Sequence, residues 1–237
     1  MKIEILADSG SVAERAAAVI ADHVWEAIAA RGRFVMAVSG GQTPWVMLRR
    51  LAARQIPWRA VHIVQVDERV APAGHVDRNL THLHESLLAH TPVSAGQIHP
   101  MPVEAGDLET AAAEYAGTLG GLAGEVPIID LVHLGLGPDG HTASLIPGDP
   151  VLDLEGADVA VTGPYQGRRR MTLTYPILNR ARRILWVVTG DEKAEMVNRL
   201  LDGDGSIPAG RVGQARAMLL ADSAAAGRPA RGGALCV

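Results

Sequence analysis

His141 is the residue whose type and position are best suited to proton transfer. It follows an apolar segment, 128–134, typical of a strand buried on both faces, and then a turn containing three glycines, a proline and Asp139. Glycine permits a sharp turn at the carboxyl end of a strand, where open α/β sheets bind ligands. Because imidazole titrates near neutrality, we expect His141 to act as a general base with Asp139 placed to orient it. The alternative is a histidine that only caps the turn or packs against it.

A second polar turn has the composition of a phosphate site. It joins the predicted strand Phe34–Val38 to a helix that begins near Pro44. Backbone N–H groups at a helix N-terminus attract phosphate through aligned donors and the positive end of the helix dipole. The residues that would supply these groups are Ser39, Gly40, Gly41 and Thr43. The lysine-containing Walker pattern is absent, and an ordinary tight turn with a helix cap is the alternative.

Charged side chains elsewhere can bind an anionic substrate. Asp67 and Arg69 follow the predicted strand Val61–Val66, so Arg69 can hold an anion while Asp67 holds hydroxyl groups. The alternative is a surface ion pair of little energetic consequence. A basic segment, 168–170, offers three guanidinium groups, one of which we expect to reach a phosphate. Lys193, near the start of a predicted helix, is a further cationic candidate, although such a lysine is usually only solvated.

Two other interpretations of these motifs are rejected. Residues 135–140 match the dinucleotide pattern GxGxxG, but Pro147 interrupts the helix that should follow, and no acidic ribose ligand ends a strand about 20 residues later. A metal site is not expected, because His82 and His84 point to different sides of a predicted helix and no cysteine joins them. His133, inside a predicted strand, is interpreted as a hydrogen-bonded core residue.

The overall composition limits the classes of function. The 237 residues, 48% hydrophobic and 20% charged, are enough for a substantial folded core. The net charge of −4 argues against nucleic-acid binding, and no apolar run approaches the roughly 18 residues of a membrane helix. The single cysteine, Cys236, excludes an intrachain disulfide, and the N-terminus lacks a signal-peptide pattern. We therefore expect a cytoplasmic protein with a single domain, residues 1–237.

Alternating strands and helices must position these motifs. Apolar segments predict the strands Lys2–Leu6, Phe34–Val38, Val61–Val66, Ile128–Leu134, Asp158–Thr162, Met171–Leu173, Ile184–Thr189 and Met218–Leu220. Apolar residues at helical spacing predict the helices Ser11–Arg31, Pro44–Arg54, Asn79–Ala89, Asp107–Leu122 and Asp191–Leu201. The last helix is expected to open with an acidic cap, and the Ala- and Gly-rich C-terminal end to be loosely held.

This alternation is typical of an α/β fold, in which a mostly parallel central sheet has helices on both faces. Crossover connections in such sheets are nearly always right-handed. The polar ends of the strands therefore share one edge of the sheet. We expect that edge to bring residues 39–43, 67–69 and 139–141 together, although they are far apart in the sequence.

The same segments make the sequence resemble the 6-phosphogluconolactonases, within the glucosamine-6-phosphate isomerase/6-phosphogluconolactonase family. The matching stretches are residues 38–44, 66–69, 134–148, 170–174 and 188–190, together with Lys193. The resemblance implies a three-layer, Rossmann-like fold of the type that glucosamine-6-phosphate deaminases and ribose-5-phosphate isomerases share. The departures from the family pattern remove no proposed catalytic group; they are Gln42, His133 and Ile146.

The resemblance also implies a reaction, a step of the pentose phosphate pathway. The expected substrate is 6-phospho-D-glucono-1,5-lactone, hydrolysed without a metal or cofactor by water that His141 activates. Its phosphate would be held by the amides of residues 39–43, Arg69 and Arg170, and a backbone N–H of the glycine turn would stabilise the oxyanion. The expected partner is thus a small sugar-phosphate lactone, with no nucleic acid and no membrane. The protein is expected to be a monomer or a small homo-oligomer.

Two alternatives are weighed against the lactonase. Glucosamine-6-phosphate deaminases also carry an Asp-Gly-His turn, but they have a glutamate five residues after the histidine, where this chain has Ile146. Isoleucine cannot transfer a proton, so the lactonase is favoured. A sugar-phosphate sensor would keep the pocket without turnover, usually beside a DNA-binding module. It is not expected, because no helix-turn-helix pattern is recognised before this domain.

Overall fold

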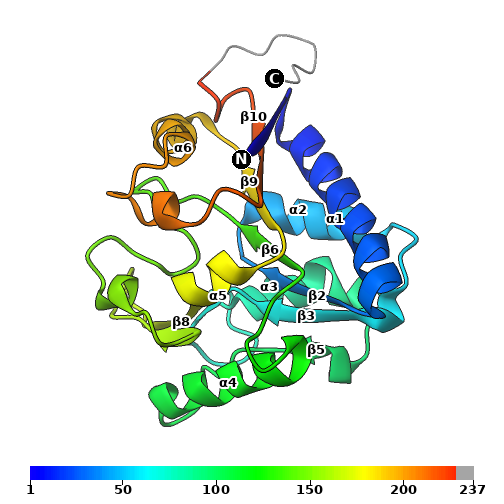
Figure 1. Ribbon diagram of the computed structural model, residues 1–237, viewed down its shortest axis with the longest axis vertical. Helices are drawn as coiled ribbons and strands as arrows, with labels where there is room; N and C mark the ends of the chain where they lie inside the picture. The colour runs from blue at the N-terminus through cyan, green and yellow to red at the C-terminus, as the bar shows by residue number, and fades with distance from the viewer. Residues whose placement is uncertain (228–237) are drawn as a thin grey trace.

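The computed structural model describes residues 1–227, and seven of their strands form one parallel sheet (Figure 1). The order across the sheet is β1-β10-β9-β6-β2-β3-β5, and each neighbouring pair is parallel. The strands are β1 (Lys2–Leu6), β2 (Phe34–Val38), β3 (Val61–Gln65), β5 (Ile98–His99), β6 (Leu131–Leu134), β9 (Ile184–Val188) and β10 (Ala217–Asp222). The central strands β9, β6 and β2 are buried along their whole length. The predicted α/β class with a mostly parallel central sheet is confirmed.

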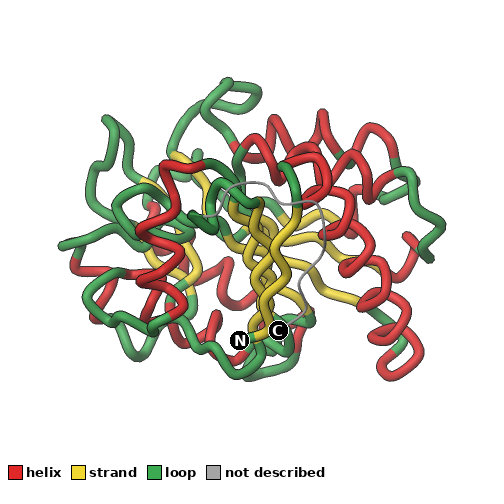
Figure 2. The backbone as a smooth tube through the Cα atoms, turned by 90° about the horizontal axis from the view of Figure 1, so that it is seen from above, coloured by secondary structure: helices red, strands yellow, loops and turns green. Residues whose placement is uncertain are grey.

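Helices cover both faces of this sheet (Figure 2). Successive side chains of a strand point to opposite faces, so Phe34 and Met36 of β2 pack in one apolar cluster while Val35 and Ala37 pack in another. Helices α1, α2 and α3 contribute to the first cluster, and α4, α5 and α6 to the second. Their bounds are α1 (Ser9–Arg31), α2 (Gln42–Ala52), α3 (Asn79–Ser86), α4 (Leu108–Ala123), α5 (Tyr175–Arg180) and α6 (Ala194–Leu201).

A second, smaller sheet is antiparallel and has the order β4-β8-β7. Its strands are β4 (Asp67–Arg69), β8 (Arg170–Leu173) and β7 (Val159–Val161). Extended segments were predicted near β7 and β8, but β4 was not, because three charged residues carry no apolar alternation. Since β4 starts two residues after β3 ends, this sheet lies at the carboxyl edge of the main one.

Several predicted element boundaries were wrong. The predicted helix 191–201 starts as a 3₁₀ turn, Asp191–Lys193, and α6 follows it. Gly190 precedes that turn without any side-chain cap, so the predicted acidic cap is absent: the acidic residues lie inside the turn. α3 ends at Ser86 rather than Ala89, and pairing of β6 begins at Leu131 rather than Ile128.

Besides β4, the strand β5 and the helix α5 were not predicted. β5 has two residues and α5 has six, so neither is long enough to show a periodic apolar pattern. The predicted loose C-terminal end, with Cys236, lies beyond residue 227 and therefore outside the described residues. Within residues 1–227, no helix combines the length and the apolar character needed to cross a membrane.

Asp130 joins three elements at the amino edge of the sheet, so its removal should destabilise the fold. Its buried carboxylate accepts hydrogen bonds from Val35 N (2.9 Å) and Arg31 Nε (3.0 Å). A buried hydrogen bond to a charged group contributes about 1.5–3 kcal/mol, whereas the exposed Arg31 side chain adds little. We therefore expect Asp130→Ala to lower the free energy of unfolding by roughly 2–3 kcal/mol in urea titrations, mainly through the bond from Val35 N. The matched control is Asp8→Ala, which removes the exposed cap of α1 and should cost ~1 kcal/mol. Equal losses for the two variants would contradict this role of Asp130.

Candidate active site

The loops that follow β2, β3, β6 and β9 enclose a cavity of about 380 Å³ at the carboxyl edge of the sheet. This volume lies in the range of roughly 300–1,000 Å³ found for small-molecule sites. The predicted site residues that line the cavity are Ser39, Gly40, Gly41, Thr43, Asp67, Arg69, His141, Arg170 and Lys193. Asp139 does not line it but contacts His141. The parallel sheet thus brings together segments separated by up to about 150 residues.

His141 and Asp139 form a hydrogen-bonded pair. Nδ1 of His141 lies 2.5 Å from Oδ1 of Asp139, and the His141 backbone N–H donates to the same oxygen at 3.2 Å. Burial alone would raise the pKa of Asp139, but the charge that His141 can carry and hydrogen bonds from His141 and Tyr165 outweigh burial and lower it. Asp139 is therefore a carboxylate at neutral pH and can only accept, so Nδ1 carries a proton, and in a neutral ring Nε2 is the nitrogen without one.

The glycine turn before His141 is shaped by close contact with its ring. A Cβ atom on Gly137 would lie 2.1 Å from Nδ1 of His141, so only glycine leaves room for the imidazole. The N–H groups of Gly137 and Gly140 donate inside the turn, to His141 O and Gly137 O. These two amides therefore already have acceptors, and the prediction that a backbone N–H of the turn stabilises an oxyanion stays a prediction for its other amides. No helix begins within residues 141–149, which excludes a dinucleotide fingerprint.

Two arginines form the cationic side of the cavity. In the small sheet, Arg69 of β4 is directly opposite Arg170 of β8. Arg69 donates to Asp77 O (3.0 Å) and Asn79 Oδ1 (2.7 Å), whereas the Nε atom of the buried Arg170 has no hydrogen-bond partner. Like charges directly opposite in a sheet destabilise it, so this arrangement favours an anion that neutralises both guanidinium groups.

The structure separates the three arginines of the basic segment. Arg168 donates to Asp77 Oδ2 at 2.6 Å, and Arg169 is paired with Glu109. Only Arg170 of the three lines the cavity. Burial lowers the pKa of Arg170, although an arginine remains protonated at neutral pH.

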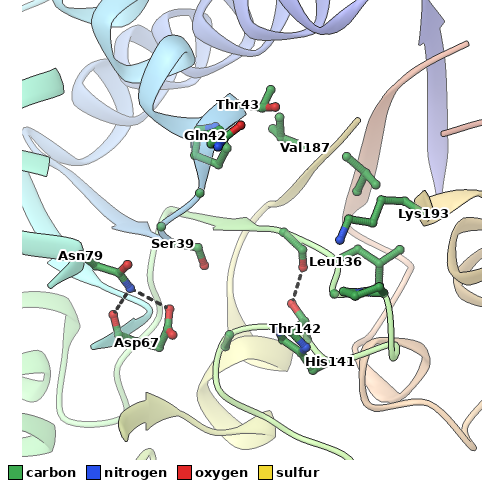
Figure 3. A pocket seen from close by; sticks show the side chains of 18 of the residues that line it. Ser39, Gln42, Thr43, Asp67, Asn79, Leu136, His141, Thr142, Val187 and Lys193 are labelled. Atoms are coloured by element: carbon green, nitrogen blue, oxygen red, sulfur yellow. Dashed lines mark hydrogen bonds between the residues drawn. The ribbon is translucent and has the colours of Figure 1, made fainter. Parts of the chain in front are cut away.

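Asp67 is buried in the wall of the cavity rather than exposed in a surface ion pair. Its side chain is 5% exposed and accepts a hydrogen bond from Ser144 Oγ at 2.7 Å. Asn79 Nδ2 donates to the Asp67 backbone oxygen at 2.9 Å (Figure 3). Burial raises the pKa of Asp67 and outweighs the opposing charge of Arg69.

The turn before α2 contains one amide that is not available to a ligand. The Ser39 N–H donates to Nδ1 of His133 at 3.3 Å, which corrects the prediction that the Ser39 amide binds phosphate. Burial lowers the pKa of His133 to about 4, so this histidine is neutral and accepts the bond, as a hydrogen-bonded core residue should. The Ser39 hydroxyl, in contrast, is buried without a hydrogen-bond partner and lines the cavity.

The helix N-terminus after Ser39 retains free donors. α2 begins at Gln42, and Gly41 before it has φ 132° and provides no side-chain cap. The first N–H groups of a helix have no partner within it, so they favour an anion at this position. Thr43 is turned toward β9, where its Oγ1 lies 2.7 Å from Oγ1 of Thr189.

The cavity has two functional sides. Figure 3 shows Ser39, Asp67 and Asn79 on one side and His141 and Lys193 on the other. Lys193, at the end of its 3₁₀ turn, lines the cavity with a side chain that is 19% exposed. The site therefore presents positive charge together with a histidine that has a free ring nitrogen.

Sequence analysis missed Asn79 as a site residue. It accepts from Arg69, donates to Asp67, and packs so closely on Gly40 that a Cβ there would lie 2.0 Å from its Oδ1. The only local signal is a polar residue at the start of a predicted helix. Nothing in the sequence indicates which side chains that residue contacts.

Glu68 was also missed, although its buried carboxylate holds this part of the site in place. Glu68 is 0% exposed and accepts four hydrogen bonds of 2.8 Å, besides its ion pair with Arg78. The donors are Gln65 Nε2 and the backbone N–H groups of Arg69, Asn79 and Leu80. It thereby ties β4 to the N-terminus of α3 and fixes the positions of Arg69 and Asn79.

A parallel sheet with a histidine–carboxylate pair and two arginines at its carboxyl edge defines an α/β protein with a small cavity whose charge suits an anionic ligand. Residues 7–220 match the family model described as glucosamine-6-phosphate isomerases/6-phosphogluconolactonase. The chain belongs to this family.

Similar proteins agree with that assignment. The chain is 36% identical to a 6-phosphogluconolactonase of Mycobacterium tuberculosis over 240 residues, which cover 95% of this chain and 97% of that protein. It is 35% identical to one of Synechocystis over 203 residues, 84% of each chain. The crystal structure of a 6-phosphogluconolactonase from Thermotoga maritima superposes with a TM-score of 0.83 and 25% identity, covering 93% of this chain and 98% of the other. A monomeric glucosamine-6-phosphate deaminase, 20% identical, shares the fold with a TM-score of 0.84 over 97% of this chain and all of the other.

Removing the charge of Glu68 should destabilise the protein strongly. Glu68→Gln leaves the buried guanidinium of Arg78 without its buried partner, and loss of one member of such a pair costs about 3–5 kcal/mol. We expect that decrease in the free energy of unfolding, measured in urea. Arg78 has a second acidic partner, Glu104, which is 55% exposed. Glu104→Gln is therefore the matched control and should cost under ~1 kcal/mol; similar losses for both would show that Glu68 has no special role.

Proposed function

We propose that this chain hydrolyses 6-phospho-D-glucono-1,5-lactone to 6-phospho-D-gluconate, with His141 as the general base. One observation carries the proposal: His141, with Nε2 free, shares one small cavity with the guanidinium groups of Arg69 and Arg170. A base and an anion site that line the same small cavity suit a phosphorylated ester. The relatives named 6-phosphogluconolactonase support the same reaction.

In the proposed mechanism, binding precedes proton transfer. The phosphate lies between Arg69 and Arg170, near the free N–H groups at the start of α2, and Lys193 adds positive charge to the cavity. This fixes the lactone carbonyl relative to His141. Positioning of this kind replaces a bimolecular encounter by a reaction within one complex, which lowers the barrier.

Proton transfer then uses one nitrogen of His141. Nε2 takes a proton from water as the water oxygen bonds to the lactone carbonyl carbon. The Asp139 carboxylate holds the proton on Nδ1 and stabilises the imidazolium that forms. When the bond between the carbonyl carbon and the ring oxygen breaks, the imidazolium returns its proton to that oxygen. A lactone is already an activated ester, so acid–base catalysis by these residues accounts for the reaction.

The residues of this site argue against glucosamine-6-phosphate deaminase activity. Deaminases of this kind would need an acidic side chain where this chain has Ile146, which is 7% exposed and does not line the cavity. An apolar side chain in that position cannot move a proton. The likeness to a deaminase structure concerns the fold alone.

Replacement of His141 tests the general base. We expect His141→Ala to lower kcat by roughly 10²–10⁴-fold, the usual contribution of a positioned base, with KM changed little. The assay is acid release from freshly made lactone, corrected for spontaneous hydrolysis, with glucosamine 6-phosphate as the control substrate. His84→Ala, an exposed histidine outside the cavity, is the control variant. Turnover of His141→Ala near that of the wild type would dismiss the assignment.

Replacement of Arg170 tests the phosphate site. A charge-assisted hydrogen bond contributes ~1.5–3 kcal/mol, so Arg170→Ala should reduce kcat/KM for the phosphorylated lactone by about 10- to 100-fold. The value for unphosphorylated glucono-1,5-lactone should change far less. Arg169→Ala removes a neighbouring arginine that is paired with Glu109 outside the cavity, and it should leave the preference intact. An unchanged preference in Arg170→Ala would rule out its contact with phosphate.

A further inference from the structure

A short hairpin turn, residues 165–168, joins β7 to β8 beside the site. Tyr165 and Arg168 exchange backbone hydrogen bonds of 2.9 and 3.2 Å. The two residues between them both have positive φ, 51° at Gln166 and 80° at Gly167, as in a type I′ hairpin turn. The ion pair of Arg168 with Asp77 fastens the turn to the loop that also receives Arg69. The position of Tyr165 is therefore well defined.

Tyr165 contacts both halves of the site. Its hydroxyl donates to Oδ2 of Asp139 at 3.1 Å, the carboxylate oxygen that His141 does not use. Its ring meets the His141 ring edge-on, with centroids 5.6 Å apart and an interplanar angle of 67°. In the other half of the site, the Arg170 guanidinium lies over the Tyr165 ring, 4.8 Å from its centroid. Tyr165 itself does not line the cavity.

We propose that Tyr165 is a positioning residue that fixes the Asp139–His141 pair and supports Arg170 at the same time. The inference rests on the proposed lactone hydrolysis. With one oxygen bound to His141 and the other to Tyr165, the Asp139 carboxylate cannot rotate, so it holds the imidazole in one tautomer and one orientation. The face of the Tyr165 ring supports the planar cation of Arg170. The Tyr165 side chain thus fixes the position of the His141 ring relative to the Arg170 guanidinium.

The two contacts belong to different parts of the side chain, so they can be separated. Tyr165→Phe removes the hydroxyl and keeps the ring. We expect it to lower kcat about tenfold, in the range seen for loss of supporting hydrogen bonds, with KM within about twofold of the wild type because Arg170 keeps its support. Tyr165→Leu removes the ring as well. It should show the same loss of kcat and, in addition, a KM raised severalfold.

Tyr175 provides a matched control. Its hydroxyl donates to Pro208 O at 2.9 Å, and its ring lies 4.7 Å below the guanidinium of Arg211, so its contacts resemble those of Tyr165. Tyr175 does not line the cavity and does not contact Asp139 or His141. Tyr175→Phe should therefore keep the kcat and KM of the wild type. A loss of kcat equal to that of Tyr165→Phe would mean that removing any such hydroxyl is harmful, which would overturn the proposal.

A measurement without substrate separates this inference from the proposed function. Nitrogen-15 NMR of the His141 ring, assigned by comparison with His141→Gln, reports which nitrogen carries the proton. We expect a single Nδ1–H form in the wild type and in Tyr175→Phe, and a mixture of tautomers in Tyr165→Phe. An unchanged spectrum in Tyr165→Phe overturns the positioning role, whether or not the wild type hydrolyses the lactone. A wild type that shows no turnover, together with the expected spectral change, would reject the proposed function alone.

The KM values test the second contact. Equal KM values in Tyr165→Phe and Tyr165→Leu would overturn the proposal that the Tyr165 ring supports Arg170.

Discussion

The hydrogen bonds and the ion pair of the buried Glu68 carboxylate hold the side of the cavity that contains Arg69 and Asn79. A charge in the protein interior is tolerated only when hydrogen bonds and an opposite charge replace the water it has lost. Here the replacement comes from one side chain, three backbone N–H groups and Arg78. Because those groups belong to β3, β4 and α3, satisfying the charge also fixes how these elements meet. Arg69 and Asn79 take their places in the cavity as a consequence.

Some polar groups around the cavity lack hydrogen-bond partners or face a like charge, and both arrangements destabilise a folded protein. Arg69 and Arg170 face each other in the small sheet, and the Ser39 hydroxyl and the Arg170 Nε atom are buried without hydrogen-bond partners. Buried polar groups are almost always paired in folded proteins. A bound anion would provide hydrogen-bond partners for these two groups, both of which line the cavity.

Two histidines show how the environment assigns different roles to the same side chain. His133 is fully buried in the central sheet, and desolvation keeps it neutral, so it serves as a hydrogen-bond acceptor for the Ser39 amide. His141 lies at the cavity wall with a carboxylate on Nδ1 and Nε2 open to a ligand. Burial without a charged partner disfavours the protonated ring of His133. The distinction follows from position in the fold, since both residues belong to the same strand-and-turn segment.

The sequence by itself determined the class of fold and the edge at which ligands bind. Buried apolar runs such as Phe34–Val38 and Ile184–Val188 specify central parallel strands, and the polar turns after them must share one edge. Only the tertiary structure decided which side chains meet there. Arg169 comes directly before β8 and is paired with Glu109, whereas Arg170 is its first residue, so pairing with β4 determines that Arg170 reaches the cavity. The occupied Ser39 amide and the contacts of Asn79 and Tyr165 likewise depend on segments 12 to about 95 residues apart. Local propensity acts over a few residues, whereas these contacts are set by strand register and side-chain direction across the whole sheet.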